Sequence, residues 1–364
     1  MNIVNQADSH KLIINLSVLL SRPTGISNYA QNLFPYLKSL QPTLLTSHNF
    51  PDFNCYPVPN NLTPAQGTKG HFLRLLWTQL KLPQIYKNLQ SQLIFSPIPE
   101  APLYTNCRFV VMSHDLIPLR FPRRFSPLTP YHRYYIPQVL QQAQHIICNS
   151  QATAKDIINF YGISSSKITP ILLGFDRSHF RFLNLPTRNY FLYLGRQDPY
   201  KNLQRLITAF AALPNYSDYE LWFAGPTDKR YTPFLKTCAE ELGVSNQIKF
   251  LDYVDYSELP EIINQAIALV FPSLWEGFGF PVLEAMACGT PVITSNLSSL
   301  PEVAGDAAIL INPYQTEEIT AAMNSILNDG GVRSQLSQKG LARANLFSWE
   351  KTGQATVEVL KKYI

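Results

Sequence analysis

FPSLWEGFGFPVLEAMACGTPVITS, residues 271–295, indicates the fold class more clearly than any other segment of the chain. It is typical of a buried strand, a glycine-rich loop, a helix and a second buried strand. The run Ala268–Phe271 is short and wholly apolar, as expected of a strand covered on both faces. Pro281 suits the first helical position, because its missing N–H group would have no intrahelical partner there. This order of elements predicts an α/β fold with a parallel sheet.

The loop and the helix start within this segment are suited to binding a phosphate. Unpaired backbone N–H groups at the positive end of a helix attract anions. The groups predicted to be unpaired are the N–H groups of Gly277, Phe278, Gly279, Val282, Leu283 and Glu284. The carboxylate of Glu284 would repel a phosphate, so we expect it to hold a neutral ribose diol. Glu276, in the loop, is expected to serve a sugar hydroxyl in the same way.

This passage resembles the signature of the retaining, nucleotide-sugar-dependent glycosyltransferases of family 4, in which two glutamates flank seven residues. Further segments resemble the same family and follow its order along the chain. They are VVMSHDLIPLRFP at 110–122, NSQAT at 149–153, GRQDPYKN at 195–202 and SSLPEVAGDAAILINP at 298–313. The chain is similar in appearance to bacterial mannosyltransferases of surface-polysaccharide assembly. The resemblance implies the GT-B fold, in which two Rossmann-like doubly wound domains face each other across a cleft.

The succession of strands and helices also indicates two α/β domains, and 364 residues suffice for two separate cores. Strands are predicted at residues 11–20, 93–96, 109–113, 145–149, 190–194, 220–224, 248–251 and 268–271. Helices are predicted at 26–40, 151–161, 202–213, 232–242 and 258–265, and a turn at 22–25. The polar segment 181–188 is typical of a linker, which gives domains at residues 1–183 and 184–345. Residues 346–364 are expected to form a helix that crosses back to the first domain, as in the family.

The composition favours a globular protein of the cytoplasm. Apolar residues make up 46% of the chain and charged residues 15%. The five cysteines are scattered and form no C-x-x-C pair, which favours reduced thiols and a reducing compartment. Asn15 and Ser17 interrupt the apolar run at 11–20, so we expect a core strand there and not a signal peptide. No apolar run reaches the ~20 residues that cross a bilayer.

Basic residues are concentrated in the first half of the chain. Residues 1–185 hold 16 Lys and Arg against 6 Asp and Glu, a net charge of +10, and the remaining residues carry −5. A basic half favours a negatively charged partner. The basic residues are dispersed and no nucleic-acid-binding motif is present, so nucleic acid is not expected. A phosphorylated acceptor or an anionic membrane surface fits better, and ordinary solvated surface charge is the simplest alternative.

Arg196 and Lys201 follow the first strand of the second domain, at the edge where open α/β sheets bind ligands. Together with the helix start after Gly279, they are expected to neutralise a nucleoside diphosphate without a metal. No D-x-D motif or His/Cys metal cluster is seen in the sequence. Arg196 is also expected to stabilise the charge that grows on the leaving phosphate. Either cation alone would be an ordinary surface charge, but their combination with Glu276 and Glu284 favours a role in catalysis.

His114 closes the predicted strand at 109–113. A lone histidine is usually structural, but the family places a histidine here beside the donor sugar, which implies that His114 donates a hydrogen bond to substrate. The resemblance also implies attack on the front face of the sugar, with the departing phosphate as the base. His114 and Glu276 would then be positioning and electrostatic residues.

Two further positions are assigned to the donor site by resemblance. Gly25 lies in the first strand-to-helix loop, where relatives carry a glycine-rich turn near the donor phosphates. Here the loop reads TGISNY, so close approach to a phosphate and a plain turn remain alternatives. Tyr253 and Val254 resemble the segment that packs on the nucleotide base, although relatives often have glycine where Asp252 stands.

Residues 71–90 mix apolar and basic side chains, which are Phe72, Leu75, Leu76, Trp77 and Leu80 on the one hand and Arg74, Lys81 and Lys87 on the other. A basic amphipathic helix can lie on an anionic membrane. Packing of this helix against its own domain is the alternative that we favour, and Pro83 is expected to interrupt it.

These features predict a metal-independent hexosyltransferase without a cofactor. GDP-mannose is the favoured donor and a UDP-hexose the alternative. The expected acceptor is a saccharide or a lipid-linked saccharide. The rival functions are a sugar-nucleotide epimerase of the same architecture and a non-catalytic scaffold on the GT-B fold, neither of which needs Arg196, Lys201, Glu276 and Glu284 together.

Overall fold

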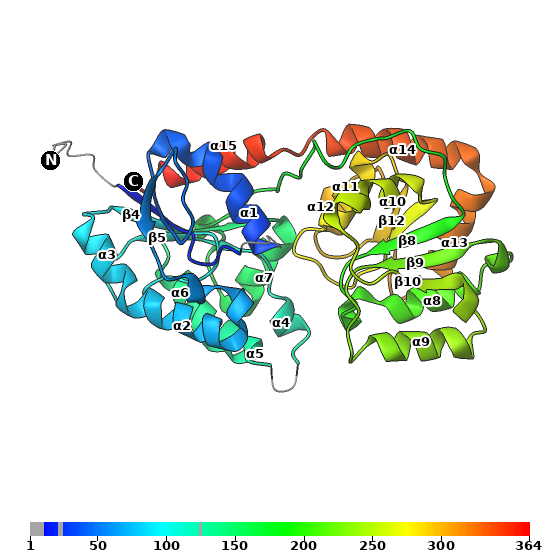
Figure 1. Cartoon of the computed structure of the whole chain (residues 1–364), viewed down its shortest axis with the longest axis horizontal. Helices are drawn as coiled ribbons and strands as arrows, with labels where there is room; N and C mark the ends of the chain where they lie inside the picture. The colour runs from blue at the N-terminus through cyan, green and yellow to red at the C-terminus, as the bar shows by residue number, and fades with distance from the viewer. Residues whose placement is uncertain (1–10, 21–24, 124–125) are drawn as a thin grey trace. The chain divides into compact units, whose positions relative to one another are not determined.

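The computed structural model describes residues 11–20, 25–123 and 126–364 (Figure 1). The chain divides into two compact units, one of Met1–Gly174 with Trp349–Ile364 and one of Phe175–Ser348. The boundary between the two units therefore lies between Gly174 and Phe175, earlier in the chain than the predicted boundary at residue 183. The reason is local packing, because His179 stacks on Tyr256 at 3.9 Å and Arg177 donates to the Phe347 carbonyl at 3.0 Å, all within the second unit.

The first unit is built on a seven-stranded parallel sheet in the order β3-β2-β1-β4-β5-β6-β7. Its strands are β1 (Leu12–Asn15), β2 (Thr43–Thr46), β3 (Asn54–Pro57), β4 (Leu93–Ser96), β5 (Phe109–Ser113), β6 (His145–Cys148) and β7 (Ile168–Pro170). The central strands are buried throughout, whereas the edge strand β3 is mostly exposed. This burial explains the continuous apolar runs in the sequence.

Helices cover both faces of this sheet (Figure 1). The α-helices are α1 (Ile26–Leu33), α2 (Gly67–Leu80), α3 (Leu82–Asn88), α4 (Ile117–Arg120), α5 (Leu128–Pro130), α6 (Ile136–Gln142), α7 (Gln151–Tyr161) and α15 (Trp349–Leu360). Short 3-10 helices are η1 (Phe34–Leu40), η2 (Asn60–Leu62), η3 (Pro64–Gln66) and η5 (Ser165–Lys167), and Tyr131–Tyr135 (η4) is a π-helix. The last helix, α15, returns to this unit, where Trp349 lies 6.2 Å from Tyr29 and Thr352 donates to the Leu172 carbonyl.

The second unit contains a six-stranded parallel sheet in the order β10-β9-β8-β11-β12-β13. Its strands are β8 (Tyr190–Leu194), β9 (Glu220–Ala224), β10 (Ile248–Phe250), β11 (Ala268–Phe271), β12 (Val292–Ser295) and β13 (Ile309–Ile311). Its α-helices are α8 (Leu203–Ala211), α9 (Thr232–Glu241), α10 (Leu259–Gln265), α11 (Phe280–Ala287), α12 (Leu300–Ala304), α13 (Thr316–Asn328) and α14 (Gly330–Ala344). Short 3-10 helices are η6 (Pro199–Lys201), η7 (Tyr216–Asp218), η8 (Ser245–Gln247) and η9 (Tyr256–Glu258).

Both sheets have the strand order of a doubly wound fold, so the predicted pair of Rossmann-like α/β units is confirmed. The order reverses between β1 and β4 in the first unit and between β8 and β11 in the second. Loops that leave these two strands at their carboxyl ends diverge to opposite faces and leave room for a ligand. Each unit therefore has one topological switch point.

Several predicted elements are shorter than expected. The strand predicted at 11–20 forms only at Leu12–Asn15, and the helix predicted at 26–40 changes to a 3-10 helix after Leu33. Pro35 explains the second change, because it lacks the N–H group that an α-helix would use. The predicted turn at 22–25 lies outside the described residues except for Gly25.

All five cysteines are free, and Cys148, Cys238 and Cys288 are buried. Within the described ranges, no helix combines the length and the apolar character needed to cross a membrane.

Candidate functional site

The loops that follow β8 and β11 meet at the switch point of the second unit. The N–H group of Leu274 donates to the Tyr200 carbonyl at 2.8 Å. Asn202, in the left-handed conformation with φ 63°, donates through Nδ2 to the carbonyls of Pro272 at 3.2 Å and Pro313 at 2.6 Å. These bonds fasten three loops of the carboxyl edge to one another and fix the residues between them.

Lys201 and Glu276 form an ion pair at this junction. The Lys201 Nζ donates to the Glu276 Oε1 at 2.5 Å, and each side chain is only 11% exposed. Lys201 therefore contacts a carboxylate, which the sequence did not predict. The pair joins the loop after β8 to the loop after β11, so one side chain orients the other.

Arg196 presents its guanidinium to solvent at the same edge. Its side chain is 67% exposed, and its Nε lies 3.4 Å from the Oδ2 of the buried Asp198. Its backbone is fixed from below, because the Tyr193 hydroxyl donates to the Arg196 carbonyl at 2.6 Å. Arg196 thus combines an anchored backbone with an accessible cation, which suits it to meet a phosphate.

The loop from Glu276 to Gly279 is held by two serines that the sequence reading did not assign. The Ser299 hydroxyl lies 3.0 Å from the Glu276 carbonyl and 2.7 Å from the Phe278 carbonyl, and Ser298 accepts from the Glu276 N–H at 3.0 Å. Gly279 has φ 111° and caps α11. The serines lie in the segment 298–313 that carried the resemblance, but their type alone did not indicate this role.

The amino end of α11 differs in detail from the prediction. The helix begins at Phe280, so Pro281 takes its second position and not its first. The N–H groups of Val282 and Leu283 donate to the Gly279 carbonyl at 3.1 and 3.4 Å, and are not unpaired. In the described part of the chain, no hydrogen-bond partner is found for the N–H groups of Phe278 and Gly279. The amides that remain available to a ligand are therefore those of the loop, and the first-turn amides of Val282 and Leu283 are not among them.

Glu284 lies within α11 and is partly exposed. Burial raises the pKa of its carboxyl from the ordinary value to about 8. Among the residues that the structure describes, no hydrogen bond or ion pair to this carboxylate is found. A carboxyl group in this state can both donate and accept, which fits the two hydroxyls of a ribose.

The segment assigned to the nucleotide base protrudes after β10. Tyr253 is 74% exposed and Val254 is half-buried. Asp252 has φ 53°, a conformation that favours glycine, and its carbonyl accepts from the Gly225 N–H at 3.0 Å.

His114 belongs to the first unit, at the carboxyl end of β5. Its Nε2 lies 2.8 Å from the Pro97 carbonyl, and its ring packs edge-on against Tyr29 at 5.0 Å. Burial lowers the pKa of the imidazole to about 4. The ring is therefore neutral near pH 7, and Nε2 must carry the proton because a carbonyl only accepts. His114 donates to the protein itself, so Nδ1 can accept from a substrate hydroxyl but not donate to it, contrary to the expectation.

Gly25 caps α1 with φ 42°, and a Cβ atom built on it would meet nothing within 4 Å. The local geometry therefore requires the glycine conformation and not close packing. In the described part of the chain, no group of three or more His, Cys, Asp or Glu residues is arranged to hold a metal ion.

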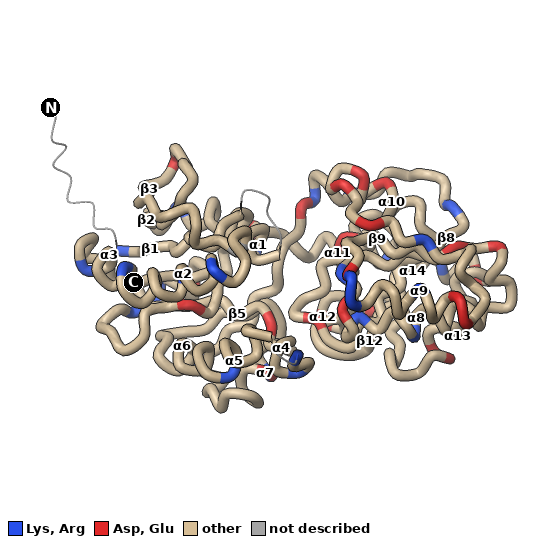
Figure 2. Tube along the Cα trace, turned by 60° about the horizontal axis from the view of Figure 1, so that its bottom comes forward, with Lys and Arg blue, Asp and Glu red and all other residues tan. Residues whose placement is uncertain are grey.

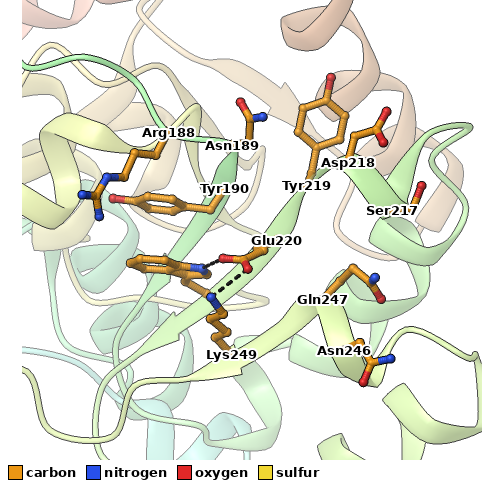
Figure 3. Close-up of a pocket in the computed structure, with 11 residues that line it drawn as sticks. Arg188, Asn189, Tyr190, Ser217, Asp218, Tyr219, Glu220, Asn246, Gln247 and Lys249 are labelled. Carbon is orange, nitrogen blue, oxygen red and sulfur yellow. Dashed lines mark hydrogen bonds and ion pairs between the residues drawn. The ribbon is translucent and has the colours of Figure 1, made fainter.

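A separate recess of about 430 Å³ lies at the opposite edge of the second sheet (Figure 3). Tyr190 and Trp222 stack there at 3.8 Å, and Glu220 binds both the Trp222 indole N–H and Lys249 at 2.7 Å. These groups satisfy one another at the amino ends of the strands. Ligands of open α/β sheets bind at the carboxyl ends, so the switch point and not this recess is the candidate site.

The sequence matches two family profiles that together extend over most of the chain. Residues 175–343 match the profile described as glycosyl transferases group 1, and residues 23–179 match glycosyltransferase family 4. The chain belongs to the family 4 glycosyltransferases. The predicted family is thereby confirmed.

Curated relatives of this glycosyltransferase include bacterial mannosyltransferases. The O-antigen chain mannosyltransferase B of Escherichia coli is 31% identical over 64% of this chain and 64% of its own length. The serotype-specific mannosyltransferase WbdA of E. coli is 30% identical over 74% of this chain and 34% of its own length. The O-antigen chain mannosyltransferase RfbU of Salmonella typhimurium is 28% identical over 86% of this chain and 90% of its own length. The chain thus spans less than two thirds of the first two relatives.

Solved structures share the fold of this glycosyltransferase. Sucrose-phosphate synthase from Thermosynechococcus elongatus superposes with a TM-score of 0.75 at 19% identity, covering 96% of this chain and 98% of its own. Anabaena HepE, solved with UDP and glucose, gives 0.74 at 18% identity over 96% and 99%. WaaG, described as a glycosyltransferase of lipopolysaccharide biosynthesis, gives 0.70 at 15% identity over 96% and 99%. The fold is therefore GT-B.

The predicted residues fall into two groups. Those of the second unit lie on the loops and helix starts of its sheet's carboxyl edge: Arg196, Lys201, Tyr253, Val254, Glu276, Gly277, Phe278, Gly279, Leu283 and Glu284. Gly25 and His114 belong to the corresponding edge of the first unit. Asn202, Ser298 and Ser299, which the sequence reading did not assign, form hydrogen bonds with the loops of the second unit's edge.

Proposed function

We propose that this glycosyltransferase moves a hexose from a sugar nucleotide to a saccharide hydroxyl, with retention at the anomeric carbon. The observation that carries the proposal is the Lys201–Glu276 ion pair at the switch point of the second unit, flanked by exposed Arg196 and the loop amides before α11. This combination offers cations and N–H donors to a diphosphate, and carboxyl groups to sugar hydroxyls.

The donor diphosphate is proposed to bind the amides of Phe278 and Gly279 together with the Arg196 guanidinium. Lys201 holds Glu276 toward the hexose and adds positive charge near the leaving phosphate. The bond between the anomeric carbon and the phosphate oxygen breaks as the acceptor oxygen bonds to the same face of that carbon. The proton of the acceptor hydroxyl passes to the departing phosphate, so no protein base is required. The charge on that phosphate grows in the transition state, where fixed cations and dipoles act most strongly.

The other donor groups fit the same arrangement. Glu284 is proposed to hold the ribose, with Leu283 beside it on α11, and Tyr253 and Val254 to lie against the base. The Nδ1 atom of His114 is proposed to accept a hydrogen bond from a sugar hydroxyl. The reaction needs neither a metal nor a cofactor in this scheme.

GDP-mannose is the proposed donor, because several relatives are named as mannosyltransferases. A UDP-hexose is the second candidate, because HepE was solved with UDP and glucose on the same fold. The test is a thermal-shift series with GDP, UDP and ADP and their hexoses. A ligand that binds the native state raises its stability by RT ln(1 + [L]/Kd), about 2.7 kcal/mol at one hundred times Kd. GDP-mannose is expected to give the largest shift.

Transfer itself is tested by incubating the preferred donor with mannose-containing oligosaccharides and reading the anomeric configuration of the product by NMR. An α-linked product from an α-linked donor supports retention, and a β-linked product contradicts it. Conversion of the donor's sugar into its epimer in the absence of an acceptor would identify an epimerase instead. If none of the sugar nucleotides binds or reacts, the result supports the alternative of a non-catalytic scaffold.

The acceptor is proposed to be a saccharide carried on a lipid, used in the cytoplasm at the inner face of the plasma membrane. RfbU and mannosyltransferase B are named for O-antigen chains, which motivates this choice. Comparing a free oligosaccharide with the same oligosaccharide on a lipid tests it, and equal kcat/KM for both would contradict it.

A further inference from the structure

Helix α2 has an unusual distribution of buried and exposed side chains. It buries Gly70, Arg74 and Thr78 along one side and exposes Phe72, Leu76 and Leu80, which are 59%, 42% and 62% exposed. A surface helix ordinarily buries its apolar stripe and exposes its charges. Here a cation faces inward and three large apolar side chains face outward.

The orientation is fixed by the buried side. Arg74 donates to both carboxylate oxygens of Glu100, at 2.7 and 2.8 Å, and to the Leu62 carbonyl at 3.0 Å. The Tyr131 hydroxyl donates to the same carboxylate at 3.0 Å. Rotating α2 to bury its apolar row would leave Glu100 charged, buried and unpaired, which is strongly unfavourable. The hydrogen bonds of Arg74 therefore keep the apolar row of Phe72, Leu76 and Leu80 exposed.

The row is continuous along the helix. Phe72, Leu76 and Leu80 follow one another at intervals of four residues and so share one face. At 1.5 Å per residue, the row extends about 12 Å along the axis. The three side chains can therefore enter one flat surface together when the helix lies parallel to it.

The charge around the row has a single sign. Lys69, Lys81 and Lys87 are exposed on or beside α2 and α3. No Asp or Glu occurs between Asp52 and Glu100, and the Glu100 carboxylate is buried against Arg74. Figure 2 shows the basic residues near α2 and α3 and the concentration of acidic residues on the second unit. Such a surface is complementary to negative charge and repels cations.

We propose that this face of α2, formed by Phe72, Leu76 and Leu80 with Lys69, Lys81 and Lys87, docks on an anionic lipid bilayer. Apolar side chains flanked by lysines match the interfacial layer, where acyl chains lie beneath anionic head groups. Three partly exposed side chains offer at most a few hundred Å², whereas a stable protein interface needs roughly 800 Å² from each partner. The proposal deepens the proposed function, because it brings the enzyme to the surface that holds a lipid-linked acceptor.

The test is co-sedimentation of the full chain with vesicles of phosphatidylcholine alone or mixed with phosphatidylglycerol. The wild type is expected to bind the anionic vesicles at least ten-fold more tightly and to lose this preference at high salt. The variant Phe72→Ser/Leu76→Ser/Leu80→Ser is expected to bind at least ten-fold more weakly. Lys69→Ser/Lys81→Ser/Lys87→Ser is expected to lose only the anionic preference.

Phe234→Ser is the matched control, because Phe234 is 74% exposed on α9 of the second unit. It should bind vesicles like the wild type. All the substituted side chains are exposed, so the melting temperature should be unchanged. The proposal is overturned if the wild type does not bind anionic vesicles, or if the variant Phe72→Ser/Leu76→Ser/Leu80→Ser binds them equally well. It is also overturned if sedimentation velocity shows that this variant converts a dimer to a monomer.

Vesicle binding is measured without donor or acceptor, so its failure is separate from failure of the proposed transfer. Transfer to a free oligosaccharide should be the same in the wild type and in the α2 variants. Transfer to a lipid-linked acceptor in anionic vesicles should fall in the α2 variants alone.

Discussion

The ammonium of Lys201 and the carboxylate of Glu276 compensate each other where neither is fully hydrated. Desolvation makes each charge costly alone, and their contact offsets that cost. The pair therefore stabilises the junction between two loops while holding both groups at the candidate donor site. The proposed function therefore predicts that stability and transfer both depend on these two residues, and the two effects can be separated by experiment.

Lys201→Met and Glu276→Gln are each expected to destabilise the second unit by about 3 kcal/mol, because each leaves a buried charge unpaired. The double variant should recover most of that loss, since both charges are removed. Thermal denaturation measures stability, and a transfer assay should remain deficient in all three variants. Restored activity in the double variant would show that the pair is only structural.

Glu284 gives the second unit a pH-dependent stability. Burial raises the pKa of its carboxyl to about 8, above the ordinary value of 4.5. A raised pKa means that the folded state binds the proton more tightly, so this contribution is complete below pH 4.5 and is lost as the pH rises toward 8.

Glu284→Gln is therefore expected to flatten the fall in melting temperature between pH 5 and 8, with little change at pH 5. Melting curves of the wild type and the variant across this range provide the measurement. An identical pH dependence in both proteins would contradict a raised pKa of the Glu284 carboxyl. Weaker nucleotide-sugar binding by the variant is expected as well, because Glu284 is the proposed partner of the ribose.

At the scale of elements, the start of α11 depends on one backbone conformation. Gly279 has φ 111°, and a Cβ atom there would lie 2.8 Å from Leu300 Cδ2 on α12. The loop amides before α11 keep their positions only if this residue keeps its left-handed conformation.

Gly279→Ala is expected to cost about 1–3 kcal/mol of stability and to weaken nucleotide binding, because it strains the backbone at the proposed anion site. Gly330→Ala is the control, since a Cβ atom at the start of α14 would meet nothing within 4 Å. The control should be neutral or slightly stabilising. Denaturant unfolding and nucleotide titration distinguish the two, and equal behaviour would contradict a special role for Gly279.

At the scale of the whole molecule, one unit consists of a single chain segment and the other of two segments. The second is one segment, Phe175–Ser348, and carries the groups assigned to the donor. The first is completed by Trp349–Ile364, in which Trp349 is buried beside Tyr29 and the Tyr363 hydroxyl lies 2.9 Å from His145 Nδ1. Loss of the last helix should therefore affect the first unit and spare the second.

Trp349→Ala is expected to destabilise the first unit by about 3–5 kcal/mol, because it leaves a large cavity under α15. Calorimetry should show one transition at a lower temperature and a second that still rises when the nucleotide is added. A single lowered transition that no longer responds to nucleotide would contradict the independence of the two units.

Some elements were predictable from local sequence and others were not. Ala268–Phe271 was predicted with its observed bounds, because a fully buried strand is a continuous apolar run. The strands Thr43–Thr46 and Asn54–Pro57 were missed, because they are short, and the latter lies exposed at the sheet edge. The helix predicted at 26–40 was too long, because helical spacing continues past Pro35 although the backbone bonding does not.

The candidate site shows the same division. The sequence identified Lys201 and Glu276 but not their contact, because the residues are 75 positions apart and belong to different loops. It identified His114 but not the direction of its hydrogen bond, which depends on the Pro97 carbonyl. Asn202 and Ser299 were not assigned, because a hydrogen bond to a distant backbone leaves no local pattern.

Chain composition and residue order alone determined the α/β class and the two Rossmann-like units, because burial periodicity is a local property. The family followed from the resemblance of several sequence segments, in their order along the chain, to known glycosyltransferases. Tertiary structure alone decided which charges are paired, which imidazole nitrogen is free, and which side of α2 faces outward. Those outcomes depend on desolvation and on partners brought together by strand order, and no local segment contains that information.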